Sequence, residues 1–340
     1  MTPRSPFLVS PAYDWAFFLL PPLAALVLGV LLSGTALSEE TVLVNGHETT
    51  ALGIAIGMLI HAHLVAVVFR SHGNPRVFAQ YPLRFVAVPI LLWIVIAGST
   101  WAAITATVVA TFWDVWHSGA QTFGFARIYD RNAGNPPDAG RRLDYWLNQL
   151  LYAGPILAGA TLLPHVDVLG DYEAVGATFF TRIPAEAEGH QRWLTWGVLG
   201  GGAAFIAVYV LANVRLWRAG YRVSPLKVYL LATTGLCSIY TWGFNTWGQA
   251  FFIMNFFHGV QYLALVWAME KKSLAERLGR FGRRAATLTP IVFFGSVACY
   301  GAGAELLDPS LTSLWALTMV VSLMHFWWDG FIWSVRKKEI

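Results

Sequence analysis

Charged side chains are scarce in this chain, and their scarcity decides the class of protein. They make up 12% of its 340 residues, whereas hydrophobic residues make up 56%. A soluble domain carries about 25% charged residues, so a soluble enzyme or carrier is excluded. Several apolar runs reach the roughly 18 residues that a helix needs to cross the hydrocarbon core of a membrane. The composition therefore predicts an integral membrane protein.

Cysteines and the short motifs of several enzyme classes are also rare or missing. The chain has two cysteines, Cys237 and Cys299, both in apolar segments, which excludes a disulfide framework and a thiolate metal site. It has no HExxH metalloprotease motif, no GxSxG nucleophile elbow, no P-loop and no CxxCH haem attachment sequence. The net charge of +4 is spread over the predicted loops, so we expect no nucleic-acid partner.

What the sequence does have is a series of apolar segments separated by short polar loops. They favour an all-α fold: a polytopic transmembrane helical bundle of about ten spans, which forms a single integral-membrane domain over residues 1–340. The expected spans are 16–37, 51–69, 85–99, 101–126, 145–164, 193–216, 227–243, 247–269, 288–306 and 312–335.

The loops between these segments alternate in charge, which predicts their orientation. Loops 38–50 and 165–192 are acidic, and the loops on the other side are basic. Of the 23 Lys and Arg residues, all but Arg182 and Arg192 fall on the basic side. Because positively charged loops stay in the cytoplasm, both termini are expected there, in a bacterial inner (cytoplasmic) membrane. The terminal basic residues are Arg4, Arg336, Lys337 and Lys338.

Seven ionisable side chains interrupt the apolar segments at a similar depth. An ionisable group in hydrocarbon is costly and faces the interior of a bundle, so it marks a site by default. Each histidine lies 7 to 13 residues before the cytoplasmic basic residues, or about 10–20 Å at the rise of a helix. Imidazoles and carboxylates at one height predict a metal site. The seven are His61, His63, His117, His258, His325, Asp114 and Asp329.

Helical spacing pairs each carboxylate with a histidine. Asp114 and His117 are three residues apart, and His325 and Asp329 are four apart, so each pair shares a helix face. We expect Asp114 and Asp329 to bind the metal, to orient a ligand histidine or to act in catalysis. Asp329 lies one turn nearer the cytoplasm than its histidine, and Asp114 one turn nearer the outside, an offset that favours two metal ions.

The remaining histidines are interpreted by their positions. His61 and His63, two residues apart, point to nearly opposite faces of a helix. They share a metal only if the helix is distorted; otherwise one is a ligand and the other packs elsewhere. His72 follows in segment 69–74 and is a further candidate ligand, if that segment folds back under the site. Three histidines of the predicted outer loops are expected at the surface: His47, His165 and His190.

Polar and aromatic residues follow the same helix faces as the histidines. Asn255, His258 and Gln261 are spaced by three residues, and Gln121 lies four residues after His117. Tryptophans flank the ligands and are placed to wall a channel for an apolar substrate. The expected substrate-binding residues are Trp113, Trp116, Gln121, Asn255, Gln261 and Trp328.

The plan of these motifs resembles the histidine-rich membrane oxygenases, which include fatty-acid desaturases and sterol and alkane hydroxylases. Their boxes have the form HxxxH and HxxHH, whereas this chain has His-Ala-His at 61–63, Asp-Val-Trp-His at 114–117 and His-Phe-Trp-Trp-Asp at 325–329. The chain is also similar to the Brp/Blh carotene-cleaving membrane proteins, whose scattered histidines are sometimes followed by glycine, as His258 is here.

These resemblances imply a membrane-embedded enzyme with one or two non-haem iron ions. It would hydroxylate, desaturate or cleave a lipid-like substrate, with electrons from a donor protein at the cytoplasmic face. Arg70, Arg127 and Asp130 are expected at that face. They either bind a lipid headgroup or a reductase there, or serve only as topology charges.

Three other functions stay open at this point. Facing histidines can hold haem b in an electron-transfer protein, which leaves Asp114 and Asp329 unexplained. A transporter or proton relay uses chains of Asp and His without a metal. Zinc accepts the same ligands as iron, so a zinc-dependent lipid hydrolase is the third alternative.

Overall fold

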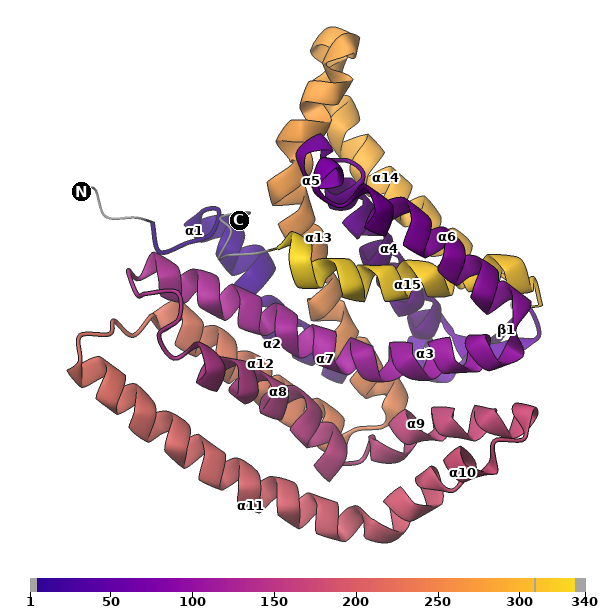
Figure 1. The fold of residues 1–340 in the computed structure, drawn as a ribbon, viewed down its shortest axis with the longest axis horizontal. Helices are drawn as coiled ribbons and strands as arrows, with labels where there is room; N and C mark the ends of the chain where they lie inside the picture. Colours follow the sequence, from indigo (N-terminus) through magenta and orange to yellow (C-terminus); the bar gives the residue numbers. More distant parts are fainter. Residues whose placement is uncertain (1–4, 309, 334–340) are drawn as a thin grey trace. The chain divides into compact units, whose positions relative to one another are not determined.

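The computed structural model describes residues 5–308 and 310–333, and nearly all of its regular structure is helix (Figure 1). Each apolar segment of the sequence contains a helix, so the all-α class is confirmed. Arg4, Arg336, Lys337 and Lys338 lie outside the described residues. The long helices are α2 (Pro21–Leu32), α4 (Ala51–Ser71), α6 (Pro82–Gly98), α7 (Thr100–Asn132), α8 (Arg141–Ala158), α11 (Ile183–Arg218), α12 (Pro225–Phe244), α13 (Trp247–Arg277), α14 (Ala285–Glu305) and α15 (Thr312–Ile332).

Shorter elements connect or extend these helices. They are α1 (Pro11–Asp14), the π-helical turn η1 (Trp15–Leu19), α3 (Ala36–Glu39), α5 (Pro75–Gln80), α9 (Leu162–Val166), the 3-10 helix η2 (Asp167–Val175), α10 (Thr178–Thr181) and the 3-10 helix η3 (Leu278–Arg284).

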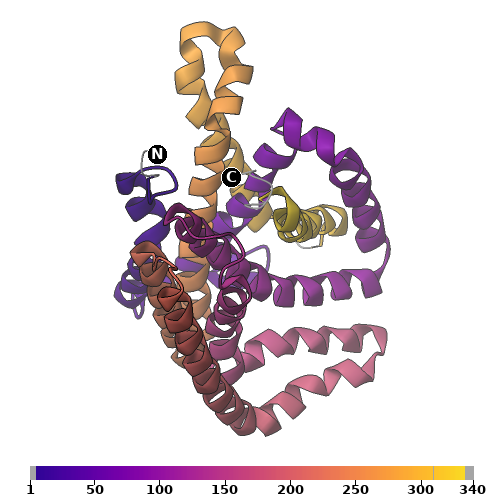
Figure 2. The same ribbon diagram turned by 60° about the vertical axis from the view of Figure 1, so that its left-hand side comes forward.

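Between three and six parts of the described chain are long and apolar enough to cross a membrane. Three are single stretches: Ala51–Ser71, Thr178–Arg218 and Trp247–Glu305. The other three are bent helix pairs, among them α6 with α7, which meet at 120°. The stretch Trp247–Glu305 holds two helices, because Gly282 (φ 58°, ψ −131°) breaks it at the tip between α13 and α14 (Figure 2). The predicted count of about ten spans is thus not confirmed.

The first predicted outer loop, 38–50, contains a β-hairpin instead. Strand β1 (Thr41–Val44) pairs antiparallel with β2 (His47–Thr50), with Val44 opposite His47. The two turn residues, Asn45 and Gly46, both have positive φ, as a tight hairpin turn requires. The Asn-Gly pair was the local signal for this turn, and the acidic composition around it gave no hint of strands.

The second predicted outer loop, 165–192, is largely helical. It holds η2, α10 and the start of α11, which begins at Ile183, ten residues before the expected span start at 193. Pro184 stands in the first turn of α11, where its fixed φ suits a helix and its missing N–H is not needed. The polar residues of this segment therefore belong to a helix that continues to Arg218.

The Cα positions divide the chain into two compact units, and each is described by itself. The first unit comprises Met1–Gly29 and Thr111–Met254, and the second comprises Val30–Ala110 and Asn255–Ile340. The expectation of a single integral-membrane domain over 1–340 stays a prediction. In the first unit α8 packs against α11 and α12 (Figure 1), around a small core of Ala126, Leu147 and Leu231.

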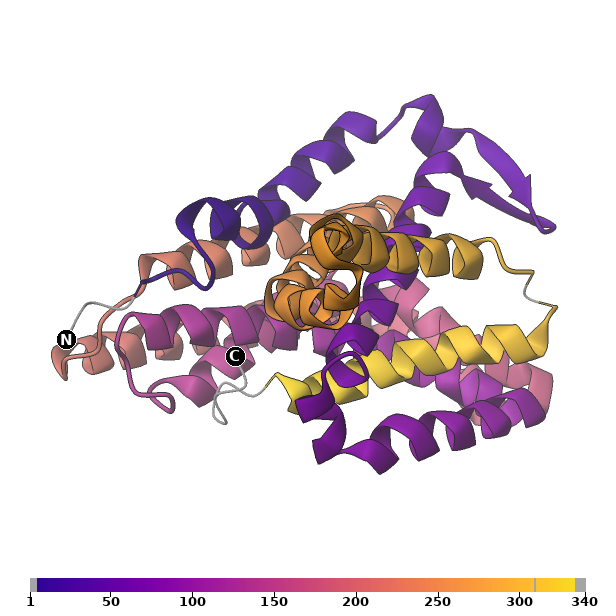
Figure 3. The ribbon, with the colours of Figure 1, turned by 90° about the horizontal axis from the view of Figure 1, so that it is seen from above.

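In the second unit α4 packs along α14 and α15, and α15 packs along α6 (Figure 3). Gly301 permits the close approach of α14 to α4, because a Cβ at this position would lie 2.3 Å from the Met58 carbonyl oxygen. Small residues at such crossings let helix backbones pack closely in membrane proteins. This packing fixes the position of α4, which carries two of the candidate histidines.

Candidate metal centre

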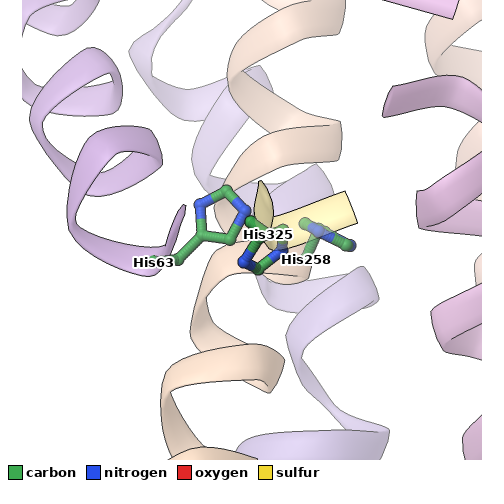
Figure 4. Close-up of side chains that lie close together, drawn as sticks. All are labelled: His63, His258 and His325. Carbon is green, nitrogen blue, oxygen red and sulfur yellow. The ribbon is translucent and has the colours of Figure 1, made fainter. Parts of the chain in front are cut away.

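Three buried histidines of the second unit point toward one another (Figure 4). His63 comes from α4, His258 from α13 and His325 from α15, and their exposed fractions are 1%, 1% and 0%. One ring nitrogen from each lies within 4.8 Å of the others. The His63 ring is 5.1 Å from each of the other two ring centroids, at 87° to both. We call these three residues the histidine trio.

The spacing of the trio is close to that of a metal site. Metal–nitrogen bonds of about 2.0–2.1 Å in a tetrahedral site hold the donor atoms about 3.4 Å apart. Closing a separation of at most 4.8 Å to that value needs each ring to move inward by about 1 Å or less. Side-chain torsions can supply such a shift without moving the three helices.

In the described chain, the ring nitrogens of His63 lack hydrogen-bond partners. Both of its ring nitrogens are buried, and neither makes a hydrogen bond within the described residues. The backbone carbonyls of Leu59 and Ile60 lie near the ring but not in hydrogen-bonding geometry. An unsatisfied buried polar group costs about 1–3 kcal/mol, and an ion bound by the ring lone pair would remove that penalty.

His325 is oriented so that one nitrogen is available as a ligand. Its Nδ1 lies 3.2 Å from the carbonyl oxygen of Leu64, which can only accept, so Nδ1 carries the proton. The lone pair of the neutral ring is then on Nε2, the usual arrangement of a metal-binding histidine. Because Leu64 follows His63 in α4, the same helical turn places one histidine of the trio and orients another.

Asp329 lies beside His325, one turn along α15. Its Oδ2 is 3.8 Å from His325 Nε2, while its Oδ1 accepts hydrogen bonds from Tyr262 Oη at 2.7 Å and Trp333 Nε1 at 2.9 Å. The Tyr262 ring also packs against His325, at 4.4 Å between centroids. The carboxylate is thus held by one oxygen, and its other oxygen faces His325.

Tyr262 and Trp333 were missed by the sequence reasoning. Tyr262 lies four residues after His258, and Trp333 lies four residues after Asp329, so each shares a helix face with a candidate that was identified. Helical spacing was therefore the signal that could have found them. They were missed because the sequence reasoning started from the ionisable residues of the apolar segments.

A buried ion pair ties the helices of the trio together. Arg70 Nη1 donates to Glu270 Oε1 at 2.6 Å, linking α4 to α13, and Asn74 Nδ2 donates to Glu270 Oε2 at 3.0 Å. Arg70 also reaches the Ile332 carbonyl of α15 at 3.3 Å and lies over the Trp333 ring. Arg70 was expected at the cytoplasmic face; it is buried, because Glu270 neutralises it in the interior.

The structure does not bring His61 or His72 into the trio. Helix α4 is continuous, so His61 points away from His63, and its Nε2 lies 3.7 Å from Glu305 Oε2. His72 follows the helix and lies within hydrogen-bonding distance of Ser71 Oγ and the Phe85 carbonyl. Burial lowers the pKa of His72, while the bond to Phe85 opposes that shift. Both of its ring nitrogens therefore have protein partners.

The other candidates of the second unit lie close to the trio in sequence. Asn255 and Gln261 are buried on α13, on either side of His258. Trp328 packs its ring against His72 and Phe85. Its Nε1 is buried and donates no hydrogen bond within the residues that the structure describes, which leaves an indole N–H for a bound molecule.

The remaining candidates belong to the first unit. His117 is buried on α7, and Asp114 accepts a hydrogen bond from Ser118 one turn away. Trp116 is exposed and donates from Nε1 to Tyr145 Oη at 2.7 Å. Trp113 and Gln121 are half-buried on the same helix.

Arg127 and Asp130 were expected at the cytoplasmic face, to bind a headgroup or reductase or to serve as topology charges; both are buried in one ionic network of the first unit. Arg127 Nη1 donates to Asp130 Oδ2 and to Asp144 Oδ2, each at 2.5 Å. Lys227 Nζ donates to the same Asp144 oxygen at 2.8 Å. Mutual neutralisation keeps these charges in the interior, where they serve the fold.

His165 is a further correction, because it is buried and not on the surface. Its ring packs edge-on against Trp242 and Trp247, and its Nδ1 lies 2.6 Å from the Thr161 carbonyl. Both tryptophans lie far from His165 in the sequence, so no local sequence pattern could predict the contact. His47 and His190 are exposed, as expected.

The donor set of the trio and Asp329 is three imidazoles and one carboxylate, which zinc and iron both accept. No protein-family model, curated protein or solved structure matches the chain.

Proposed function

We propose that this protein is an integral-membrane metalloenzyme whose metal is held by His63, His258 and His325, with Asp329 as a fourth ligand or as a partner of His325. The observation that carries the proposal is the convergence of three buried ring nitrogens within 4.8 Å, one of them on a histidine without any hydrogen bond in the described residues. A packing role would leave that imidazole unsatisfied.

We propose iron as the metal, in one or two ions, with zinc as the alternative. Nitrogen and oxygen ligands suit both. A second ion would be held by Asp114 and His117, which share a face of α7 in the first unit. Iron bound at such ligands would supply one-electron chemistry with dioxygen, which suits hydroxylation, desaturation or cleavage of an unactivated chain.

The chain's own residues would bind and orient an apolar substrate and exclude water. Aromatic side chains pack against the trio: Tyr262 against His63 and His325, and Phe326 against His325. The free indole N–H of Trp328 and the buried amides of Asn255 and Gln261 are placed to hold polar atoms of a lipid-like molecule. The Tyr262 hydroxyl keeps its proton and donates a hydrogen bond to Asp329. Electrons would come from a donor protein at the cytoplasmic face.

We further propose about ten spans with both termini in the cytoplasm of a bacterial inner membrane. Support comes from the helix found in each apolar segment and from the uneven distribution of the 23 basic residues. In a background without Cys237 and Cys299, a cysteine at Gly189 should react with an impermeant thiol reagent added outside. A cysteine at Ala139 should react only after the membrane is opened. The reverse pattern would refute the orientation.

Elemental analysis of the purified protein, combined with its absorption spectrum, tests the function. We expect one or two iron ions per chain and no Soret band. A Soret band would identify a haem protein, and zinc in place of iron would favour the hydrolase. A protein purified without chelators that holds no metal would leave the transporter or proton relay as the better account.

A further inference from the structure

The tip of the hairpin that α13 and α14 form in the second unit is strongly basic. Residues 271–284 hold six cations and one carboxylate, Glu276, which gives a net charge of +5. All six cations are exposed, and none of them makes an ion pair within residues 5–308 and 310–333. They are Lys271, Lys272, Arg277, Arg280, Arg283 and Arg284.

This basic tip stands clear of the other helices of its unit. Figures 1 and 2 show it beyond α4, α5, α6 and α15. Glu270, directly before the tip, is held by Arg70 and Asn74. Beyond it, no side chain of residues 271–284 makes a hydrogen bond to another element of the described chain. The charges of the tip are therefore available to a partner.

The length of α13 carries the basic tip past the lipid headgroups. Residues 247–269 contain no charged side chain and extend about 34 Å as a helix, enough to cross a hydrocarbon core of about 30 Å. The helix continues to Arg277, about 10 Å further along the same axis. A headgroup layer is only about 5–8 Å thick. The arginines of η3 then lie in water, which favours a soluble partner over the membrane surface.

The basic tip suits a partner that binds briefly. Phe281 is 45% exposed, and the Arg280 guanidinium lies over its ring at 4.8 Å. Aromatic and arginine side chains are common anchors of protein interfaces. The 14 residues of the tip are fewer than the roughly 20–30 that each side of a stable complex contributes. Strong charge on a small surface speeds association without slow release, as the encounters of electron carriers require.

The base of the hairpin lies beside a route to the histidine trio. Glu270 pairs with Arg70, and Arg70 lies over the Trp333 ring. Trp333 is half-buried and donates a hydrogen bond to Asp329, whose other oxygen faces His325. A protein held against the hairpin would therefore lie near an aromatic side chain that a hydrogen bond links to the candidate metal ligands.

We infer that the basic tip, residues 271–284, docks a soluble, acidic electron-carrier protein. The inference rests on the proposed oxidation chemistry, which needs an external source of electrons. Negative charge on the carrier complements the six cations of the tip, and an apolar spot among those charges would receive Phe281. The docking surface itself does not include the metal ligands.

Two electron carriers of opposite charge test the inference on the full-length protein. The protein is placed in nanodiscs of phosphatidylcholine, which has no net charge, and the probes are an acidic plant-type ferredoxin and a basic cytochrome c. At low salt the ferredoxin should bind and the cytochrome should not. The variant Arg280→Gln/Arg283→Gln/Arg284→Gln should lower the association rate of the ferredoxin about tenfold, and added salt should reduce that difference.

A second triple variant controls for total charge. Arg142→Gln/Arg215→Gln/Arg218→Gln removes three exposed arginines of the first unit and should leave the association rate nearly unchanged. Phe281→Ala should speed dissociation of the ferredoxin about fivefold. A parent that does not bind the ferredoxin, or that binds both carriers alike, would overturn the inference. Equal losses in the two triple variants would do the same.

A label on the basic tip distinguishes a soluble partner from the membrane surface. Gly279 is exposed, so Gly279→Cys, in a background without Cys237 and Cys299, can carry a fluorophore. Acrylamide in the water should quench it equally in nanodiscs with and without phosphatidylglycerol. Protection by phosphatidylglycerol would place the tip on the membrane and overturn the inference.

Metal content separates failure of this inference from failure of the proposed function. Protein stripped of metal by a chelator should bind the ferredoxin as the parent does, because docking uses residues 271–284 alone. A parent that holds iron but does not bind the ferredoxin would refute the docking surface only. A parent that binds the ferredoxin at the basic tip but never holds metal would refute the metal centre and support the docking surface.

Discussion

Replacing His63 with leucine should lower the protein's affinity for the metal at least tenfold without unfolding the protein. A metal site that loses a ligand or the partner of a ligand loses about 10–100-fold in affinity. Leucine has a similar size, and it also removes an imidazole that makes no hydrogen bond in the described chain. The metal-free variant should therefore be as stable as the metal-free parent or more so, by up to about 1–3 kcal/mol.

The matched control for this experiment is His61→Leu. His61 lies two residues away on the same helix, and its ring faces Glu305 and not the trio. The His61→Leu variant should retain the metal content of the parent. Metal content and thermal stability in the same detergent check both variants. If His63→Leu keeps its metal, or if its metal-free form is strongly destabilised, His63 is a packing residue and the site is elsewhere.

Replacing Asp144 with alanine should destabilise the first unit by about 3–5 kcal/mol, the usual effect of removing one partner of a buried ion pair. Asp144 is buried and accepts from Arg127, Lys227 and Tyr209. Its loss leaves two cations with only Asp130 to neutralise them. Lys227 then lies 3.7 Å from the remaining carboxylate, too far for a normal hydrogen bond.

Asp138→Ala is the control for charge alone, because Asp138 is exposed in the loop before α8. Its effect should stay within about 0.5 kcal/mol, as for most surface substitutions. Denaturant unfolding in a fixed detergent measures both variants. A loss below about 1 kcal/mol in Asp144→Ala would show that the network contributes little to the fold.

Hydropathy was sufficient to predict a helix in each apolar segment, because burial in an apolar phase requires each segment to satisfy its own backbone. It did not predict the helices within the polar segment 165–192. The same regularity separated His61 from His63, since two residues along a helix correspond to a large rotation. It also placed Asp329 beside His325. These are local properties, and a single sequence contains them.

Contacts between segments that are distant in the chain could not be predicted from a single sequence. Glu270 lies 200 residues from Arg70, and no spacing rule connects the two. His165 is buried by tryptophans of two other helices, α12 and α13. The hairpin at 41–50 depends on a turn whose neighbours looked like an ordinary acidic loop. In each case the deciding interaction joins segments that are adjacent only after folding.

X-ray absorption at the K-edge of the metal in the purified protein would identify the atoms that bind the metal. We expect nitrogen and oxygen ligands at about 2.0–2.2 Å, with the outer scattering of three imidazole rings. In His63→Leu the imidazole contribution of any residual metal should fall from three rings to two. A sulfur shell near 2.3 Å, a porphyrin spectrum, or a parent and a variant with the same imidazole count would contradict it.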